Sequence, residues 1–279
     1  MVTHSAETPT FLGTGYRSRK PRRQGITHAL DKGTPVVALE ALMPSVSDFV
    51  DVWKFGWGLA YADPEIKSKV EVLRRNGVNA CPGGTLLEIS WQQDRMEEFF
   101  AWTAEVGFPC VEVSSGATGI PAEAKRELIR QARSLGFEVL AEVGSKDPAD
   151  HATAQQWVDE ILADTEAGAS WVVAEGRESG TVGIYESDGQ IRAELVKEIE
   201  RSVDRSTIIY EAPRRAQQAW LIRHIGSQVN LGNIAVSDLP SVESLRLGLR
   251  TDTIDVSLEA GKRNRDIDRS TTTRYPGST

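Results

Sequence analysis

Three glutamates in this sequence each follow a short apolar run. Glu142 follows Val-Leu-Ala, Glu175 follows Val-Val-Ala, and Glu211 follows Ile-Ile-Tyr. One such glutamate could simply pair with a nearby arginine. Three carboxylates that meet at one end of a sheet, however, repel one another unless a cation joins them. The recurrence therefore predicts an oxygen-ligand metal site made of Glu142, Glu175 and Glu211, with Mg²⁺ as the ion.

Two lysines and an arginine follow the same kind of run. Lys54 ends Val-Asp-Val-Trp-Lys, Lys146 lies four residues after Glu142, and Arg177 lies two residues after Glu175. A lysine is a compact charge that can also transfer a proton, whereas the planar fork of an arginine suits carboxylate or phosphate. Either lysine alone could be a surface residue, but both beside Arg177 predict an anion clamp.

Glycine-rich turns collect after the same runs, as in Pro82-Gly-Gly-Thr85 and Glu175-Gly-Arg-Glu-Ser-Gly180. Exposed amides in such turns can cradle phosphate oxygens, and small side chains let a ligand approach the backbone. The candidate substrate-binding residues are Arg177, Lys32, Gly83, Gly84, Ser179 and Asn233.

The common signatures of other enzyme classes are missing. The four histidines are dispersed and form no His-Glu-x-x-His pair, and neither a Gly-x-Ser-x-Gly elbow nor a P-loop occurs. His28 falls inside a strand-like run, and we expect it to be a core residue. These absences argue against zinc protease, serine hydrolase and NTPase chemistry.

Parallel strands must position these side chains, and eight strand-like runs alternate with helical stretches. The expected strands span residues 25–30, 49–55, 78–81, 110–113, 138–143, 171–174, 207–210 and 228–231. Helical spacing of apolar residues is clear over 64–76, 121–135, 154–166 and 214–224. Glycines stand where five helices should stop, at Gly77, Gly107, Gly136, Gly168 and Gly226.

Eight such units in 279 residues predict an α/β fold, a (β/α)8 TIM barrel in a single domain. Polar, glycine-rich or charged sequence at both ends predicts flexible tails. We place a flexible N-terminal arm over residues 1–22, the catalytic barrel over 23–260, and a flexible C-terminal tail over 261–279.

The amino-acid composition restricts the kinds of molecule that this protein is expected to bind. The formal net charge of −8 argues against general affinity for nucleic acid or anionic membranes. No run of about 20 apolar residues could span a bilayer. Cys81 and Cys110 form no Cys-x-x-Cys pair and suit buried, reduced thiols. We expect a cytoplasmic enzyme with no nucleic-acid or membrane partner.

Several ordered motifs resemble those of the phosphosulfolactate synthase family. They include Leu30-Asp-Lys-Gly33, Val52-Trp-Lys-Phe-Gly-Trp-Gly58, Cys81-Pro-Gly-Gly-Thr-Leu86, Glu142-Val-Gly-Ser-Lys-Asp-Pro148, Glu175-Gly-Arg-Glu-Ser-Gly180, Glu211-Ala-Pro213 and Val229-Asn-Leu-Gly-Asn-Ile-Ala235. The resemblance runs from about Arg23 to Thr253. It implies a TIM-barrel, Mg²⁺-dependent carbon–sulfur lyase that adds sulfite to phosphoenolpyruvate, in coenzyme M or sulfolactate formation, and a homo-oligomer.

The resemblance also implies roles. Lys146 matches the lysine of the family's Glu-Val-Gly motif and would stabilise charge on the substrate or donate a proton. Lys54 and Arg177 would hold phosphate or sulfite. Glu142, Glu175 and Glu211 would bind the metal or orient its water ligands.

The sequence departs from the family pattern in places. Ser114-Ser-Gly116 stands where Ser-Asp-Gly is common, and Gly144-Ser-Lys146 stands where Gly-Lys-Lys is frequent. Two alternatives therefore stay open. One is a barrel enzyme that adds another nucleophile to phosphoenolpyruvate or a similar phosphorylated enol acid. The other is a non-catalytic protein, because a related plant branch is linked to heat stress and a fold alone does not guarantee an activity.

Overall fold

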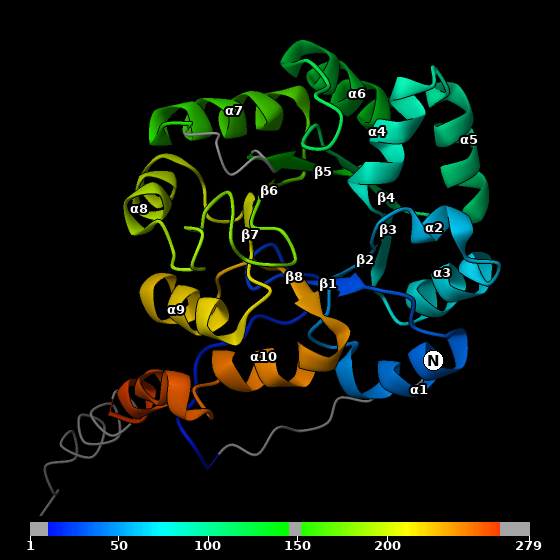
Figure 1. Ribbon diagram of the computed structural model, residues 1–279. Helices are drawn as coiled ribbons and strands as arrows, with labels where there is room; N and C mark the ends of the chain where they lie inside the picture. Colours follow the sequence, from blue (N-terminus) through cyan, green and yellow to red (C-terminus); the bar gives the residue numbers. More distant parts are fainter. Residues whose placement is uncertain (1–10, 145–151, 263–279) are drawn as a thin grey trace, which may run out of the picture.

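The computed structural model describes residues 11–144 and 152–262, in which eight parallel strands curl into a barrel (Figure 1). The strands are β1 (Thr27–Asp31), β2 (Val52–Phe55), β3 (Asn79–Pro82), β4 (Cys110–Val113), β5 (Glu138–Val143), β6 (Trp171–Ala174), β7 (Ile208–Glu211) and β8 (Leu231–Ala235). Their order is β3-β2-β1-β8-β7-β6-β5-β4, so the first and last strands of the chain are hydrogen-bonded neighbours. The predicted (β/α)8 TIM barrel is confirmed.

Helices form the outer ring of the barrel in Figure 1. They are α1 (Val36–Val46), α2 (Leu59–Ala62), α3 (Ile66–Arg75), α4 (Gly84–Gln92), α5 (Met96–Val106), α6 (Ala122–Ser134), α7 (Ala154–Ala167), α8 (Ala193–Ser202), α9 (Arg215–Ile225) and α10 (Leu239–Arg246). Each buries one apolar face, as Val70 and Leu73 of α3 show. Among the described residues, no helix is both long and apolar enough to cross a membrane.

Glycines end the helices where the sequence predicts. All five predicted stop residues have positive φ angles. At the end of α5, Gly107 has a φ of 93° and its amide donates to the carbonyl of Thr103 at 3.2 Å. This left-handed conformation is strained for residues with a Cβ, which explains why glycine marks the boundary.

A layer of apolar side chains fills part of the barrel interior. Its members come from seven strands or the residues that flank them: Ile26, Val52, Cys81, Cys110, Leu140, Val173 and Ile209. Successive side chains of a strand point to opposite faces, so the residue two positions later points inward again. The apolar layer therefore forms a floor beneath whatever occupies those next inward positions.

Strand boundaries match the sequence-based ranges best in the middle of the chain. The ranges predicted for β4, β5 and β6 coincide with the observed strands, whereas β8 begins at Leu231 instead of residue 228. Just before β8, the Asn230 side chain accepts a hydrogen bond from the Ile26 amide at 2.9 Å and donates to the Ile208 carbonyl at 3.0 Å. Asn230 thus joins β8 to its neighbours by side-chain bonds, and the ladder starts after it.

Residues 15–22 of the predicted arm pack against the barrel. Arg17 pairs with Glu243 at 2.9 Å, and the Lys20 ammonium donates to the Gly77 carbonyl at 2.8 Å. Arg22 lies 3.2 Å from Asp51. Ion pairs thus hold several basic side chains of this segment against the barrel, and the flexible arm over residues 1–22 stays a prediction. Residues 1–10, and 263–279 of the predicted tail, lie outside the described residues.

Candidate active site

A cavity of about 450 Å³ opens at the carboxyl ends of the strands, where TIM-barrel enzymes carry out their chemistry. Its lining residues are Leu30, Lys54, Gly56, Trp57, Gly83, Gly84, Thr85, Glu112, Ala117, Glu142, Glu175, Arg177, Glu178, Ser179, Glu211 and Asn233. The cavity thus brings together nine of the residues proposed from the sequence. Two others differ: Lys32 does not line the cavity, and Lys146 lies outside the described residues.

Five charged side chains stand directly above the apolar floor. Each follows a floor residue by two positions, in the pairs Val52 and Lys54, Cys110 and Glu112, Leu140 and Glu142, Val173 and Glu175, and Ile209 and Glu211. The strand period of two explains this stacking, because both members of a pair point into the barrel. The local sequence therefore places four carboxylates and one ammonium in a single buried layer.

Lys54 crosses the barrel to reach two of these carboxylates. Its ammonium lies 2.9 Å from Glu112 and 3.4 Å from Glu211. All three side chains are at least 94% buried. Burial alone would lower the pKa of Lys54, but the charges of Glu112, Glu211 and Glu142 outweigh burial and raise this pKa above its ordinary value. Lys54 is therefore a positively charged group at neutral pH.

Glu112 is a site residue that the sequence reasoning missed. One carboxylate oxygen accepts from Lys54 and the other accepts from the Gly84 amide at 2.9 Å. Burial and the charge of Glu142 raise the pKa of Glu112, against the opposing effect of Lys54. The signal in the sequence is an acid inside the apolar strand Cys110–Val113, two positions after an inward cysteine, whereas the predicted glutamates all stand at strand ends.

The backbone amides of the glycine turn after β3 donate hydrogen bonds to acceptors within the protein. The Gly83 amide donates to the Phe55 carbonyl at 3.0 Å and the Gly84 amide donates to Glu112. Both glycines line the cavity, but these amides are already engaged, so a phosphate cradle made of them is not supported. Thr85 also lines the cavity and lies in the first turn of α4, where amides have no intrahelical acceptor.

Three residues at the cavity hold unusual backbone conformations. Trp57, Arg177 and Asn233 have φ angles of 51°, 55° and 53°. Such angles are rare for residues other than glycine and cluster at functional sites. The Arg177 amide donates to the Glu175 carboxylate at 2.5 Å, so the turn that presents Arg177 is tied to a cavity glutamate.

Lys32 lies at the rim of the barrel, outside the cavity lining. Its ammonium is 5.1 Å from the centre of the Trp57 ring and 4.0 Å from Glu178. Its side chain is about half exposed. Lys32 thus contacts two cavity residues, and its role in substrate binding stays a prediction.

His28 is fully buried in the barrel interior, as expected of a core residue. Gly232 packs against its ring so closely that a Cβ there would lie 3.0 Å from the Nδ1 atom. Among the described residues, neither ring nitrogen has a hydrogen-bond partner. Burial and the nearby charge of Lys54 keep the pKa of His28 well below its ordinary value, so the ring is neutral.

The described carboxylates form no ready-made metal cage. No group of three His, Cys, Asp or Glu side chains in residues 11–144 and 152–262 has metal-binding geometry. Glu211 is bound to Lys54 and to the Gly176 amide, at 3.4 and 2.9 Å. Mg²⁺ usually takes only one or two carboxylates and completes its shell with water and substrate phosphate. Glu142 and Glu175 line the same cavity and present carboxylate oxygens of the kind that Mg²⁺ binds.

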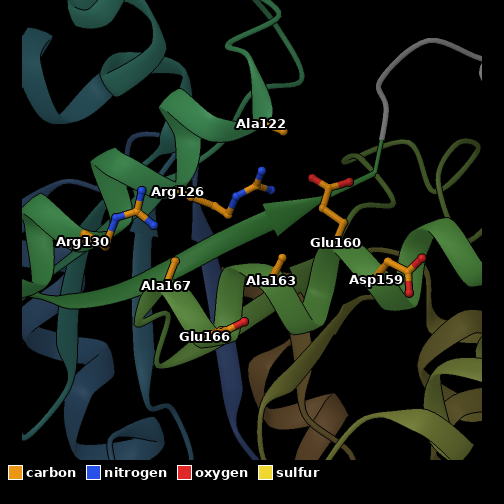
Figure 2. Close-up of a pocket in the computed structure, with 8 residues that line it drawn as sticks. All are labelled: Ala122, Arg126, Arg130, Asp159, Glu160, Ala163, Glu166 and Ala167. Carbon is orange, nitrogen blue, oxygen red and sulfur yellow. The ribbon is translucent and has the colours of Figure 1, made fainter.

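A larger groove lies outside the barrel between α6 and α7 (Figure 2). Its volume is about 830 Å³, and its lining residues are Ala122, Arg126, Arg130, Asp159, Glu160, Ala163, Glu166 and Ala167. Arg126 and Arg130 pair with Glu123 of their own helix. No strand end contributes to this groove, so the chemistry belongs to the smaller cavity.

A TIM barrel with buried carboxylates, a lysine and an arginine at the carboxyl ends of its strands is an enzyme that acts on small molecules. The family model of (2R)-phospho-3-sulfolactate synthase (ComA) matches residues 15–252. The chain therefore belongs to this family of carbon–sulfur lyase-type enzymes.

Similar proteins agree with this assignment. Phosphosulfolactate synthase from Methanothermobacter thermautotrophicus is 42% identical over 243 residues, which cover 85% of this chain and 94% of the relative. The synthase from Bacillus subtilis is 37% identical over 240 residues, covering 85% and 95%. Among solved structures, 3-hexulose-6-phosphate synthase from Salmonella typhimurium has a TM-score of 0.51 at 14% identity, covering 85% of this chain and 97% of its own. This last likeness concerns the fold alone.

Proposed function

We propose that this enzyme adds sulfite to phosphoenolpyruvate in the presence of Mg²⁺ and forms phosphosulfolactate. Besides membership of the family, the excess of negative charge in the cavity lining supports this proposal. Its described lining holds five glutamates but only two cations, Lys54 and Arg177. A multiply charged anion such as phosphoenolpyruvate would be repelled by this lining unless a cation entered with it.

The reaction balances without an oxidant or reductant. The sulfur lone pair of sulfite attacks the methylene carbon of phosphoenolpyruvate, and a carbon–sulfur bond forms. The electrons of the carbon–carbon double bond move toward the carboxylate and give an enediolate-like dianion. A proton then adds to the carbon that carries the phosphate ester.

Different residues of the chain would assist different steps of this reaction. Lys54 is a fixed, buried ammonium and would stabilise the charge that develops on the substrate carboxylate. Arg177 would hold the phosphate or sulfite through its planar fork. Lys146, whose surroundings lie outside the described residues, would deliver the proton. Asn233 and Ser179 line the cavity and would orient polar groups of the substrate.

Glu142 and Glu175 would hold the metal, and Glu211 would orient one of its water ligands. When bound, Mg²⁺ would neutralise carboxylate and phosphate oxygens and lower the energy of the dianion. Glu211 is given the second role because it pairs with Lys54 at 3.4 Å and accepts from the Gly176 amide at 2.9 Å.

A direct assay tests the proposal. Purified protein is incubated with phosphoenolpyruvate, sulfite and Mg²⁺, and phosphosulfolactate is sought by mass spectrometry. We expect product only when all three are present and none after chelation of the metal. Absence of product at high enzyme concentration would contradict the sulfite reaction. Replacing sulfite by other nucleophiles tests the alternative activity, and inactivity with all of them would favour a non-catalytic role.

The different nucleophile that the Ser115 departure from the family pattern suggests stays a prediction. Ser115 is absent from the cavity lining, whereas Glu112 and Ala117 on either side of it are present. The cytoplasmic location and the homo-oligomer implied by the resemblance stay proposals. Light scattering on the purified enzyme would measure the number of subunits.

A further inference from the structure

One seam of the barrel lacks a backbone ladder. The order of the strands starts at β3 and ends at β4, and in the described residues no ladder joins these two, although they lie side by side. Side chains cross the seam instead. The Cys110 thiol donates to the Ala80 carbonyl at 3.4 Å, and Glu112 accepts from the Gly84 amide at 2.9 Å. The geometry at this seam therefore depends on side-chain contacts.

Glu112 is the contact at the seam that reaches the cavity. From β4 it binds Lys54 on β2 through one oxygen and the start of α4 through the other, each at 2.9 Å. The fit is close, because a Cβ on Gly84 would lie 3.2 Å from Glu112 and 2.3 Å from the Ser114 hydroxyl. A single buried carboxylate thus fixes two cavity groups that belong to different elements.

We propose that Glu112 is a positioning residue that closes the β3–β4 seam and sets the Lys54 ammonium relative to the first turn of α4. Its importance for turnover rests on the proposed function. The substrate would meet Lys54 on one side and Thr85 on the other, and both line the cavity. Small displacements of such groups reduce catalysis strongly, since the reacting geometry is then lost.

Substitution of Glu112 by glutamine tests this role. The amide oxygen of Glu112→Gln can accept one of the two bonds, but its NH₂ group would oppose the donors on Lys54 or Gly84. We expect hydrogen exchange of the Gly84 amide to accelerate at least about 10-fold, because its charge-assisted bond is either lost or replaced by a weaker bond to a neutral amide oxygen. In the active enzyme, kcat should fall about 100-fold while KM for phosphoenolpyruvate changes much less.

Glu243→Gln is the matched control. Glu243 also binds a cation, Arg17, but lies on α10 outside the cavity lining. This variant should leave Gly84 exchange and kcat unchanged. If Glu112→Gln does not fold, Glu112→Asp gives the same two readouts, since it keeps the charge but withdraws it by one methylene. We expect both readouts to move in the same direction by smaller factors.

The outcomes separate this inference from the proposed function. Unchanged Gly84 exchange in a folded Glu112 variant overturns the positioning role, whatever the activity. Unchanged kcat in a background that forms product also overturns it. If the wild-type protein forms no product from phosphoenolpyruvate and sulfite, the proposed function fails, and the exchange measurement alone decides the role of Glu112.

Discussion

Lys54 neutralises the negative charge of two buried carboxylates. The described site therefore depends on this side chain more than on any single carboxylate. Glu112 and Glu211 are 3% and 1% exposed, and Lys54 is their shared cation. Removing one member of a buried ion pair leaves an uncompensated charge. The same lysine is thus expected to serve both stability and the stabilisation of charge on the substrate.

Lys54→Met should lower the free energy of unfolding by about 3 kcal/mol at pH 7. The loss should shrink toward pH 5, because the pKa of Glu112 is already raised and its carboxyl group takes up a proton more readily in the variant. Urea unfolding at both pH values measures this. The double variant Lys54→Met with Glu112→Gln should regain part of the stability, and a double variant less stable than the single one would contradict the account.

His28 should make the stability sensitive to acid. Its pKa is lowered in the folded state, so below pH 6.5 the unfolded chain binds a proton that the folded protein does not. The stability contribution is complete above that pH and declines by up to about 1.4 kcal/mol per pH unit on acidification. His28→Gln should remove this slope, measured by urea unfolding from pH 7.5 to 5.5. The exposed His224→Gln serves as control, and parallel curves for wild type and His28→Gln would exclude the effect.

The glycine at the end of α5 shows how a helix boundary is fixed. Gly107 has a φ of 93°, and an added Cβ would meet only Val70, at an ordinary 3.9 Å. Gly107→Ala should therefore cost about 1–2 kcal/mol of unfolding free energy through backbone conformation alone. Gly107→Asn should cost less, because asparagine tolerates this region better. Equal stability of Gly107→Ala and wild type in urea would show that the boundary does not need glycine.

Much of the element pattern could be predicted because strands β4 to β6 are short apolar runs between clear helices. The eighth strand was also predicted, but its bounds were not, since Gly232 and Asn233 weaken its strand signal and Asn230 makes ladder-like bonds with its side chain. Similarly, Glu112 was missed because its role depends on Lys54, a residue 58 positions away in sequence. Local patterns predicted that charges gather at the strand ends, but not which of them pair.

The N-terminal segment joins the barrel through contacts distant in sequence. The Gly15 amide donates to the Leu247 carbonyl at 3.1 Å, and the Ser18 amide donates to Gln228 at 3.3 Å. With the ion pairs of Arg17 and Arg22, these contacts bind the segment to the side of the barrel opposite the cavity. Composition alone predicted a flexible arm here, because the partners of the basic residues are not local.

Two N-terminal deletions would distinguish the stability contribution of residues 15–22 from that of the residues before them. Removing residues 1–14 should change the melting temperature little. Removing residues 1–22 should lower the free energy of unfolding by about 3 kcal/mol, since several hydrogen bonds and two partly buried ion pairs are lost. Differential scanning calorimetry and urea unfolding measure both effects. Equal stability of the two shortened proteins would mean that residues 15–22 contribute nothing.

The cavity should bind phosphoenolpyruvate and Mg²⁺ together, because its described lining has more glutamates than cations. Isothermal titration of phosphoenolpyruvate into the enzyme, with Mg²⁺ or with a chelator, tests it most directly. We expect binding at least about 100-fold tighter with Mg²⁺, equivalent to about 2.7 kcal/mol. Equal affinity with and without the metal would contradict it.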